Sequence, residues 1–421
     1  HWEVIAFKYF TDLLSGNSPE DVELVEQNGI NYFKVDELNS TDSKNRLHNS
    51  KWLVTRDGGQ KVYGDNILLI PKRGAAIGTN KIAITTGEHS FDTNIMGIRL
   101  DQDKVNIDFI ARWIRNRNLI EIADTSTIPQ INNKHINPLK LGLPSKDEQT
   151  QIANYLDHQT GIIDQLIQKK KQLIEKLKEQ RQAIINEAVT KGLDPNVKLK
   201  DSGIEWIGEI PEHWAVAPLK YYTNIIGGYA FSSQDFVEEG VQLIKIANLY
   251  QNKLSLERQP TFITKELAEK HSDYKVYKND ILMSLTGTLG KRDYGYAILA
   301  NEDEDLIVNQ RVAKITTREK CDVRFSIYQF QSEDYLNKLF QTPGGTKQGN
   351  LSCDNVVSIR MPIPALQEQT QIANYLDHQT GIIDQIVEKT KLSIEKLEEQ
   401  RRSIISEAVT GKVDVREWKK N

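Results

Sequence analysis

The sequence predicts an α+β protein built as a pseudo-twofold tandem repeat. Two mixed globular domains are separated by two long helices that form an antiparallel coiled coil. Three observations predict this fold class. The 18 letters EQTQIANYLDHQTGIIDQ occur at residues 148–165 and again at 368–385, an offset of 220 residues. Both copies open long stretches of good helix formers, and the segments before them share little identity while carrying short strand and helix patterns.

The repeat continues beyond these letters. Residues 166–190 match 386–410 at 15 of 25 positions, and both copies close on Glu-Ala-Val-Thr. A second correspondence joins residues 1–11 to 213–223, with six of eleven positions identical. The segment 201–212 has no counterpart before His1, so we expect the chain to begin inside the first repeat. The sequence is therefore a tandem duplication whose globular parts have diverged.

The repeated segments are predicted to be helices that pack against each other. From Gln149 to Ala188 there is no proline and one glycine. An apolar stripe at heptad-like spacing predicts a long helical partner, although two separate helices that each cover their own domain remain the alternative. The stripe comprises Ile163, Leu166, Ile167, Leu173, Ile174, Leu177 and Ile184, and in the second copy Ile383, Ile386, Val387, Ile394, Leu397 and Ile404. Parallel packing would force the linker at 191–212 to run back about 60 Å, close to its extended limit, so antiparallel packing is favoured.

These patterns divide the chain into six parts. They are a first domain at 1–143, a helix at 144–190, a linker at 191–212, a second domain at 213–363, a helix at 364–412 and a tail at 413–421. Within the domains we expect strands at 61–71, 241–247 and 276–285, and helices at 107–117 and 323–340.

Composition excludes several classes of protein. Apolar residues make up 38 % and charged residues 27 % of the 421 positions, which is typical of a soluble globular protein. No apolar run reaches the length of a membrane span, no signal peptide opens the sequence, and two cysteines are too few for a disulfide framework, so we expect a cytoplasmic protein without a membrane partner. The net charge of -4 argues mildly against nucleic-acid binding, but screening over roughly 8–10 Å lets local basic patches act independently.

The sequence does not match the motifs of several common enzyme classes. Residues 287–292 lack the spacing of a phosphate-binding loop, and residues 137–140 do not match the adenine methyltransferase motif. The eight histidines show no metal-ligand spacing, and His158 and His378 favour polar contacts over metal ligation. We therefore predict no catalytic residue, no metal and no cofactor on this chain.

Glycine-rich loops with basic and amide side chains recur in both domains. Arginine and lysine read guanine edges, asparagine and glutamine read adenine edges, and glycines let backbone amides approach phosphates. Any one loop could be an ordinary solvated turn, but the recurrence at corresponding places favours DNA contact. The candidates are Arg56, Lys72, Arg73, Asn80, Lys81, Gln130 and Asn132 in the first domain, and Lys291, Arg292, Gln310, Arg311, Lys347, Gln348 and Asn350 in the second.

The two like helix surfaces predict two copies of one partner in a pseudo-twofold arrangement. The candidate docking residues are polar or amphipathic, and some of them must simply face solvent. They are Asn154, Tyr155, His158, Gln159, Asp164 and Gln165, with the counterparts Asn374, Tyr375, His378, Gln379, Asp384 and Gln385.

Several motifs together resemble one known family. The segment DSGIEWIGEIPEHW at 201–214, the glycine loop at 344–350, the run at 359–369 and the long helix after it resemble the specificity subunits of type I restriction-modification systems. The first domain departs from this pattern at 126–132, where the glycine loop is replaced.

The resemblance implies two target recognition domains, each reading one half of a bipartite site in double-stranded DNA, with the helices as spacer and docking surface. It implies no catalysis by this chain. It further implies two partner methyltransferase subunits that modify adenine from S-adenosylmethionine, and restriction subunits that can also join. The competing hypothesis is a structural adaptor in which a coiled coil presents two protein-binding domains.

Overall fold

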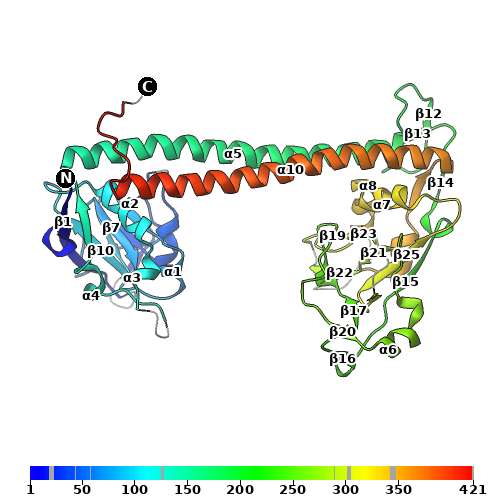
Figure 1. The fold of residues 1–421 in the computed structure, drawn as a ribbon, viewed down its shortest axis with the longest axis horizontal. Helices are drawn as coiled ribbons and strands as arrows, with labels where there is room; N and C mark the ends of the chain where they lie inside the picture. The colour runs from blue at the N-terminus through cyan, green and yellow to red at the C-terminus, as the bar shows by residue number, and fades with distance from the viewer. Residues whose placement is uncertain are drawn as a thin grey trace. The chain divides into compact units, whose positions relative to one another are not determined.

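A computed structural model describes residues 1–18, 23–42, 44–56, 58–124, 128–288, 290–300, 305–341 and 348–419. The chain divides into two compact units (Figure 1). Unit 1 comprises residues 1–171 and 391–421, and unit 2 comprises residues 172–390. Each of the two long helices therefore gives one part to each unit.

Unit 1 contains two main sheets and a short pair of strands. The first sheet has the order β2 (Thr11–Ser15), β10 (Ile95–Leu100), β7 (Ile67–Pro71), β8 (Ala83–Thr85) and β5 (Arg46–Leu47). The second has the order β3 (Leu24–Val25), β6 (Leu53–Val54), β4 (Ile30–Phe33) and β9 (His89–Phe91). The strands β1 (Glu3–Ala6) and β11 (Lys140–Leu143) pair antiparallel just before the first long helix. The short helices are α1 (Ala75–Gly78), α2 (Ile107–Arg117), α3 (Leu119–Ile122) and α4 (Asn133–Ile136).

Unit 2 repeats this topology. Its first sheet has the order β15 (Thr223–Gly227), β25 (Val312–Thr317), β21 (Ile281–Ser284) and β23 (Ala297–Leu299). Its second has the order β16 (Phe236–Val237), β20 (Phe262–Ile263), β17 (Val241–Ile244) and β24 (Leu306–Val308). The pair β14 (Ala215–Pro218) and β27 (Arg360–Ile363) corresponds to β1 and β11, while β12 (Leu199–Asp201) with β13 (Glu209–Pro211), and β18 (Leu249–Tyr250) with β19 (Lys253–Leu254), are further hairpins. Its helices are α6 (Lys265–Lys270), α7 (Val323–Gln331), α8 (Glu333–Phe340) and α9 (Cys353–Val357).

The predicted central strands are shorter than the sequence pattern indicated. β7 covers only the second half of 61–71, and β21 only the second half of 276–285. In both cases an asparagine directly before or near the strand takes a left-handed conformation, Asn66 with φ 59° and Asn279 with φ 71°. Because such a residue turns the chain, the extended pairing cannot continue through it.

The helices after β10 and β25 begin at side-chain caps. α2 has the predicted bounds, and Asn106 accepts from the Asp108 and Phe109 amides at its start. The predicted helix at 323–340 is instead two helices, because Ser332 leaves the helical conformation and caps α8 by accepting from the Tyr335 amide.

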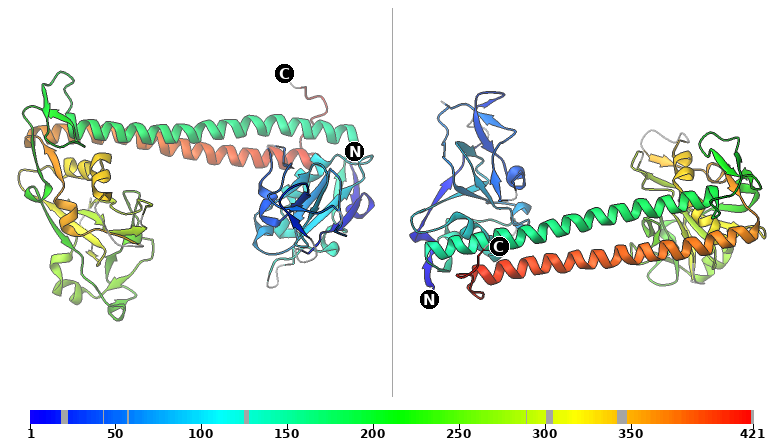
Figure 2. Two further views of the ribbon diagram at one scale, coloured as in Figure 1. Left: turned by 180° about the vertical axis from the view of Figure 1, so that it is seen from behind. Right: turned by 90° about the horizontal axis from the view of Figure 1, so that it is seen from above.

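The two predicted long helices are confirmed as α5 (Lys146–Lys191) and α10 (Leu366–Val409). In each unit a part of α5 runs antiparallel alongside a part of α10 (Figure 2). Side chains spaced by three, four or seven residues form the buried seam, each less than 9 % exposed. These are Leu156, Thr160, Ile163, Ile167 and Ile174 on α5, and Leu376, Thr380, Ile383, Thr390 and Ile394 on α10.

Part of the predicted apolar stripe lies outside this seam. Leu166 and Leu173 are 42 % and 43 % exposed, and Ile386 is 40 % exposed. A two-helix pair buries only the narrow row of residues that faces the partner helix, so apolar residues one position away stay in solvent.

The helix ends belong to the domain cores. In unit 1, Ile152 and Leu156 share a core with Phe109 and with Val409 from the end of α10. In unit 2, Val189 and Leu376 share a core with Trp214 and Phe325. Fully burying such a side chain stabilises the fold by about 1.5–3 kcal/mol. Among the described helices, none combines the length and apolar character needed to cross a membrane.

Candidate nucleic-acid interface

In unit 2 three loops that lie far apart in the sequence meet at the ends of β21 and β25. The strand β22 (Thr286–Thr288) pairs with β26 (Gln348–Asn350). The Arg311 guanidinium donates to the Asn350 side-chain oxygen at 3.4 Å, and the Leu285 amide donates to the Arg311 carbonyl at 2.9 Å. The described parts of these loops that carry Arg311 and Asn350 therefore lie beside each other.

Unit 1 builds the same junction. The Lys72 amide donates to the Asn94 carbonyl at 2.7 Å, and the Ile131 amide donates to the Lys72 carbonyl at 2.9 Å. Arg73 lies opposite Gln130 in an antiparallel bridge. Three of the predicted residues, Lys72, Arg73 and Gln130, are thus neighbours.

A glycine directly after β2 in unit 1, and directly after β15 in unit 2, lets two backbone segments approach closely. A Cβ atom on Gly16 would lie 2.2 Å from the Phe91 carbonyl oxygen, and one on Gly228 would lie 2.3 Å from the Asn309 carbonyl oxygen. Only glycine fits such an approach. The residue after each glycine is therefore held beside the loop that precedes β10 or β25.

Tyr229 is the residue that follows Gly228, and the sequence reasoning missed it. Its side chain is 39 % exposed, and its ring centroid lies 4.0 Å from that of His271. Tyrosine hydroxyls are among the groups that contact DNA backbones. A pair of glycines followed by aromatic residues at 227–231 is the signal that could have identified this position.

Most predicted DNA-contact residues present their side chains to solvent. The exposed ones are Arg56, Arg73, Asn132, Lys291, Arg292, Gln310, Arg311 and Asn350, and the half-buried ones are Lys72, Asn80, Lys81 and Gln130. Lys347 and the side chain of Gln348 lie outside the described residues.

Three predicted residues are engaged within the fold. The Asn80 amide donates to the Arg115 carbonyl at 2.7 Å and its oxygen accepts from the Leu119 amide at 3.1 Å, so its side chain joins α2 to α3 rather than facing a ligand. Arg56 forms an ion pair with Glu88. The Arg292 guanidinium lies 5.3 Å from the centroid of the Phe340 ring.

The position of Arg311 is taken in unit 1 by Asn94, which the sequence reasoning also missed. Asn94 is exposed, and its side-chain amide donates to Asp92 at 2.9 Å. Aligning the strands β10 and β25 by their apolar pattern would have found it. The same backbone junction therefore carries an amide in unit 1 and a guanidinium in unit 2.

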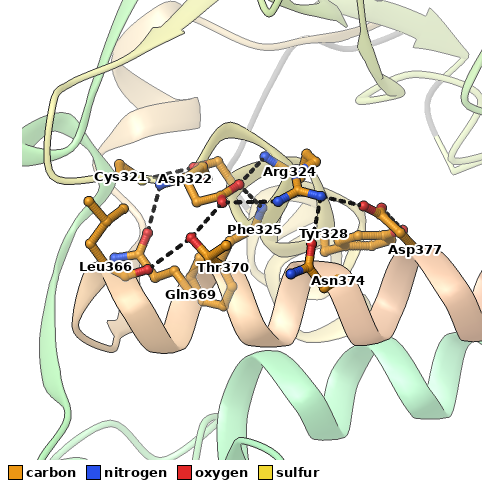
Figure 3. Close-up of polar contacts among 11 residues, drawn as sticks. Cys321, Asp322, Arg324, Phe325, Tyr328, Leu366, Gln369, Thr370, Asn374 and Asp377 are labelled. Atoms are coloured by element: carbon orange, nitrogen blue, oxygen red, sulfur yellow. Dashed lines mark hydrogen bonds and ion pairs between the residues drawn. The ribbon is translucent and has the colours of Figure 1, made fainter.

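A second polar site joins each long helix to its globular domain. In unit 2 the Asp322 amide donates to the Gln369 side-chain oxygen at 2.9 Å (Figure 3). The Gln369 amide donates to the Pro364 carbonyl at 2.9 Å. Thr370 donates to the Asp322 carboxylate at 2.9 Å. These bonds fasten the cap of α7 to the first turn of α10.

Two turns further along α10, two residues of α7 hold an aspartate (Figure 3). Arg324 donates to the Asn374 oxygen at 2.8 Å and to Asp377 at 3.0 Å. Tyr328 donates to the other oxygen of Asp377 at 2.8 Å. Burial raises the pKa of Tyr328, and the Asp377 carboxylate reinforces this, so the tyrosine stays protonated and donates.

Unit 1 has the matching contacts. The Asn106 amide donates to the Gln149 oxygen at 2.7 Å, and the Gln149 amide donates to the Pro144 carbonyl at 2.9 Å. Arg112 forms an ion pair with Asp157, which corresponds to Asp377. The identical letters of the repeat are thus explained in part by contacts within the chain.

Several of the predicted docking residues contact other residues of the same chain. Asn374 accepts from Arg324, and Tyr155 and His158 contact the ring of Trp418 with centroids 5.6 Å and 5.5 Å apart. The two predicted aspartates form ion pairs across the helix pair: Asp164 with Arg401 at 2.8 Å and Asp384 with Arg181 at 3.1 Å. The residues Asn154, Gln165, Tyr375, His378 and Gln385 are exposed, while Gln159 and Gln379 are half-buried.

Exposed apolar residues beside these positions were not predicted as docking residues. Ile162 and Leu166 are 43 % and 42 % exposed, and their counterparts Ile382 and Ile386 are 43 % and 40 % exposed. The same apolar pair is therefore presented once in each unit.

Among the described residues, no group of three or more histidine, cysteine, aspartate or glutamate side chains could hold a metal ion. The fold and the two junctions define a protein built as a tandem repeat. The chain matches the family described as the type I restriction modification DNA specificity domain, over residues 1–176 and again over 211–398. It belongs to this family, whose members supply DNA sequence specificity rather than catalysis.

Curated relatives agree with this assignment. The chain is 27 % identical to the type I restriction enzyme MjaVIII specificity subunit of Methanocaldococcus jannaschii over 420 residues, which cover 99 % of this chain and 93 % of the relative. It is 23 % identical to the EcoBI specificity subunit of Escherichia coli over 332 residues, which cover 76 % of this chain and 69 % of the relative.

Solved structures share the fold. A chain from a study of complex assembly and conformational transition in the type I R-M system has a TM-score of 0.74, 13 % identity and 98 % coverage of both chains. The HsdS subunit from Thermoanaerobacter tengcongensis has a TM-score of 0.54 and 14 % identity, with 98 % of this chain and 97 % of that chain covered.

Proposed function

We propose that this chain reads a bipartite target in double-stranded DNA, one half-site per unit. The observation that carries the proposal is the repeated loop junction, which has the same backbone bonds in both units but different side chains. At one equivalent position of the junction, unit 2 has the guanidinium of Arg311 and unit 1 has the amide of Asn94. Because guanidinium and amide groups prefer different bases, two unlike sets of side chains suit two unlike half-sites.

The chain also docks two copies of an adenine methyltransferase subunit, one on each copy of the repeated helix surface. The equal exposure of Ile162 with Leu166 and of Ile382 with Ile386 supports this, because a repeated apolar surface binds like partners. S-adenosylmethionine belongs to that partner, and restriction subunits join the same assembly. Membership of a DNA specificity family favours this function over a protein-binding adaptor. Two free cysteines fit a cytoplasmic setting.

The test is to express the chain with its methyltransferase and to sequence methylated adenines. The double variant Lys72→Ala with Arg73→Ala should weaken or relax only one half of the motif, and Gln310→Ala with Arg311→Ala only the other. Each lost base contact costs about 1–3 kcal/mol of binding free energy. Lys51→Ala is the control, because Lys51 is exposed and pairs with Asp36 away from the junction. Unchanged motifs in both double variants would refute the assignment of these loops.

A further inference from the structure

Unit 1 contains a cavity of about 380 Å³ where α2 meets α10. Two arginines of α2, Arg112 and Arg115, line one side, and two arginines of α10, Arg401 and Arg402, line the other. The remaining lining residues are Asn45, Gly78, Asn80, Asn116, Asn118, Thr160 and Ile405. The described lining residues thus include four guanidinium groups and no carboxylate.

Only half of this positive charge is neutralised from outside the cavity. Arg112 pairs with Asp157, and Arg401 pairs with Asp164. Arg115 donates to the neutral oxygens of Asn45 and Ile82, both at 2.8 Å. Two cations, Arg115 and Arg402, therefore remain without a carboxylate among the described residues.

The Arg115 guanidinium is destabilised in its charged form. Its burial, with the nearby charges of Arg401 and Arg112, lowers the pKa of Arg115 to about 10. Arg402 is exposed and Arg115 is half-buried, so burial makes a compensating anion most important for Arg115.

The second unit shows that the fold does not need this charge. The corresponding cavity of about 510 Å³ is lined by Gln182 and Gln331. Gln182 is the counterpart of Arg402 in the 220-residue repeat. Gln331 donates to the Ala297 carbonyl at 2.8 Å. This bond is equivalent to the bond that Arg115 donates to the Ile82 carbonyl in unit 1.

The third cationic position is also neutral in unit 2. Tyr328 donates to Asp377 where Arg112 pairs with Asp157. The cavity of unit 2 does contain Lys178 and Arg292, but it also contains the carboxylates of Glu179 and Glu333. The cavity lining of unit 2 therefore consists of neutral side chains and of cations accompanied by carboxylates. The lining of unit 1 contains four arginines instead.

We propose that the arginine cavity of unit 1 binds a phosphoryl group. Guanidinium groups bind phosphate oxygens with paired, charge-assisted hydrogen bonds, and two uncompensated cations match the charge of a phosphate. The volume lies within the range of roughly 300–1,000 Å³ that is usual for ligand sites. The group belongs either to the backbone of bound DNA, which rests on the proposed function, or to a free phosphate compound. The presence of Gly78 and Asn80 in the lining connects the cavity to the loop at 72–81 that also carries Lys72 and Arg73.

The test compares Arg402→Gln, which installs the residue of the other repeat, with Lys178→Gln as a matched control. Lys178 lines the cavity of unit 2, so its loss changes the net charge equally on the same pair of helices. In the full chain, inorganic phosphate binding is measured by calorimetry and by the shift in melting temperature, against chloride at equal ionic strength. Phosphate should bind about tenfold more weakly to Arg402→Gln and unchanged to Lys178→Gln.

A second arm identifies the source of the phosphate. Binding of target duplex to the methyltransferase complex is followed from low to high salt. A DNA phosphate predicts that Arg402→Gln lowers the slope of log affinity against log salt by about 0.9. An unchanged slope with weakened phosphate binding assigns the site to a free phosphate compound. Equal phosphate binding by wild type and Arg402→Gln, or an equal loss in Lys178→Gln, overturns the proposal. Because the phosphate arm needs no DNA, a chain that fails to bind duplex would refute the proposed function and leave this result standing.

Discussion

Gln149 and Gln369 each join the first turns of a long helix to its globular domain. Each is at most 1 % exposed, and each accepts one backbone amide and donates to two backbone carbonyls. A buried side-chain amide whose hydrogen bonds are all formed fixes the angle at which a helix leaves a domain. Any shift of the helix would leave several buried polar groups without hydrogen-bond partners. Two domains with unlike sequences use the same residue for the same purpose.

Replacing either glutamine tests this role. Gln369→Ala should lower the free energy of unfolding by about 1–3 kcal/mol, because the Asp322 amide and two carbonyls lose a partner. Gln149→Ala should do the same in unit 1. Urea denaturation followed by circular dichroism measures both, and Gln385→Ala, an exposed position on the same helix, serves as the control. A loss no larger than that of the control would show that water replaces these bonds.

At the scale of elements, each long helix has a buried apolar row and an exposed apolar row. The residues Ile163, Ile167 and Ile174 face the other helix, while Leu166 and Leu173 face solvent. The heptad pattern in the sequence identified both sets as one stripe. It could not divide them, because the division depends on how closely the partner helix approaches.

Substitution of the exposed set tests the proposed docking surface. Leu166→Glu and Ile386→Glu occupy equivalent places in the repeat, so each should remove one methyltransferase copy, and the double variant should remove both. Native mass spectrometry of the reconstituted complex counts the copies. The melting temperature of the chain alone should hardly change, because both side chains are already in solvent. A complex that keeps two copies in the double variant would move the docking surface elsewhere.

Much of the element order could be predicted from local patterns. The helix at 107–117 is expected from its sequence pattern, and the long helices from their repeat. The positive φ of Asn66, which shortens β7, and the break at Ser332 depend on tertiary context. The loop junctions depend on contacts such as Lys72 with Ile131, which local patterns do not contain. Asn94 and Tyr229 have recognisable sequence signals, but those contacts are needed to place them at the junctions.

At the scale of the whole molecule, a net charge of -4 coexists with a strongly basic cavity. The sum of charges describes solubility, whereas recognition depends on where the charges lie. The repeated topology with divergent loops allows each recognition surface to change while the helix junctions remain the same.

This separation predicts that specificity can be exchanged in halves. Replacing residues 224–355 by the equivalent segment of a relative with another specificity should change one half of the methylated motif and leave the other half unchanged. Gln369 and Asp377 lie outside the exchanged segment, whereas their partners Asp322, Arg324 and Tyr328 lie within it. Assembly should therefore persist when the relative supplies equivalent groups at those three positions. Methylome sequencing reads the outcome, and a motif altered in both halves would show that the units do not read independently.

The division of each long helix between the two units has a consequence for synthesis on the ribosome. Unit 2 consists of residues 172–390 alone, so all of it has been made while unit 1 still lacks residues 391–421. The first unit to be started is therefore the last to be completed, because Ala408 and Val409 belong to its core. A chain that stops after Thr390 would keep unit 2 and expose the core of unit 1, so a premature stop late in the sequence damages the unit that contains the N-terminus.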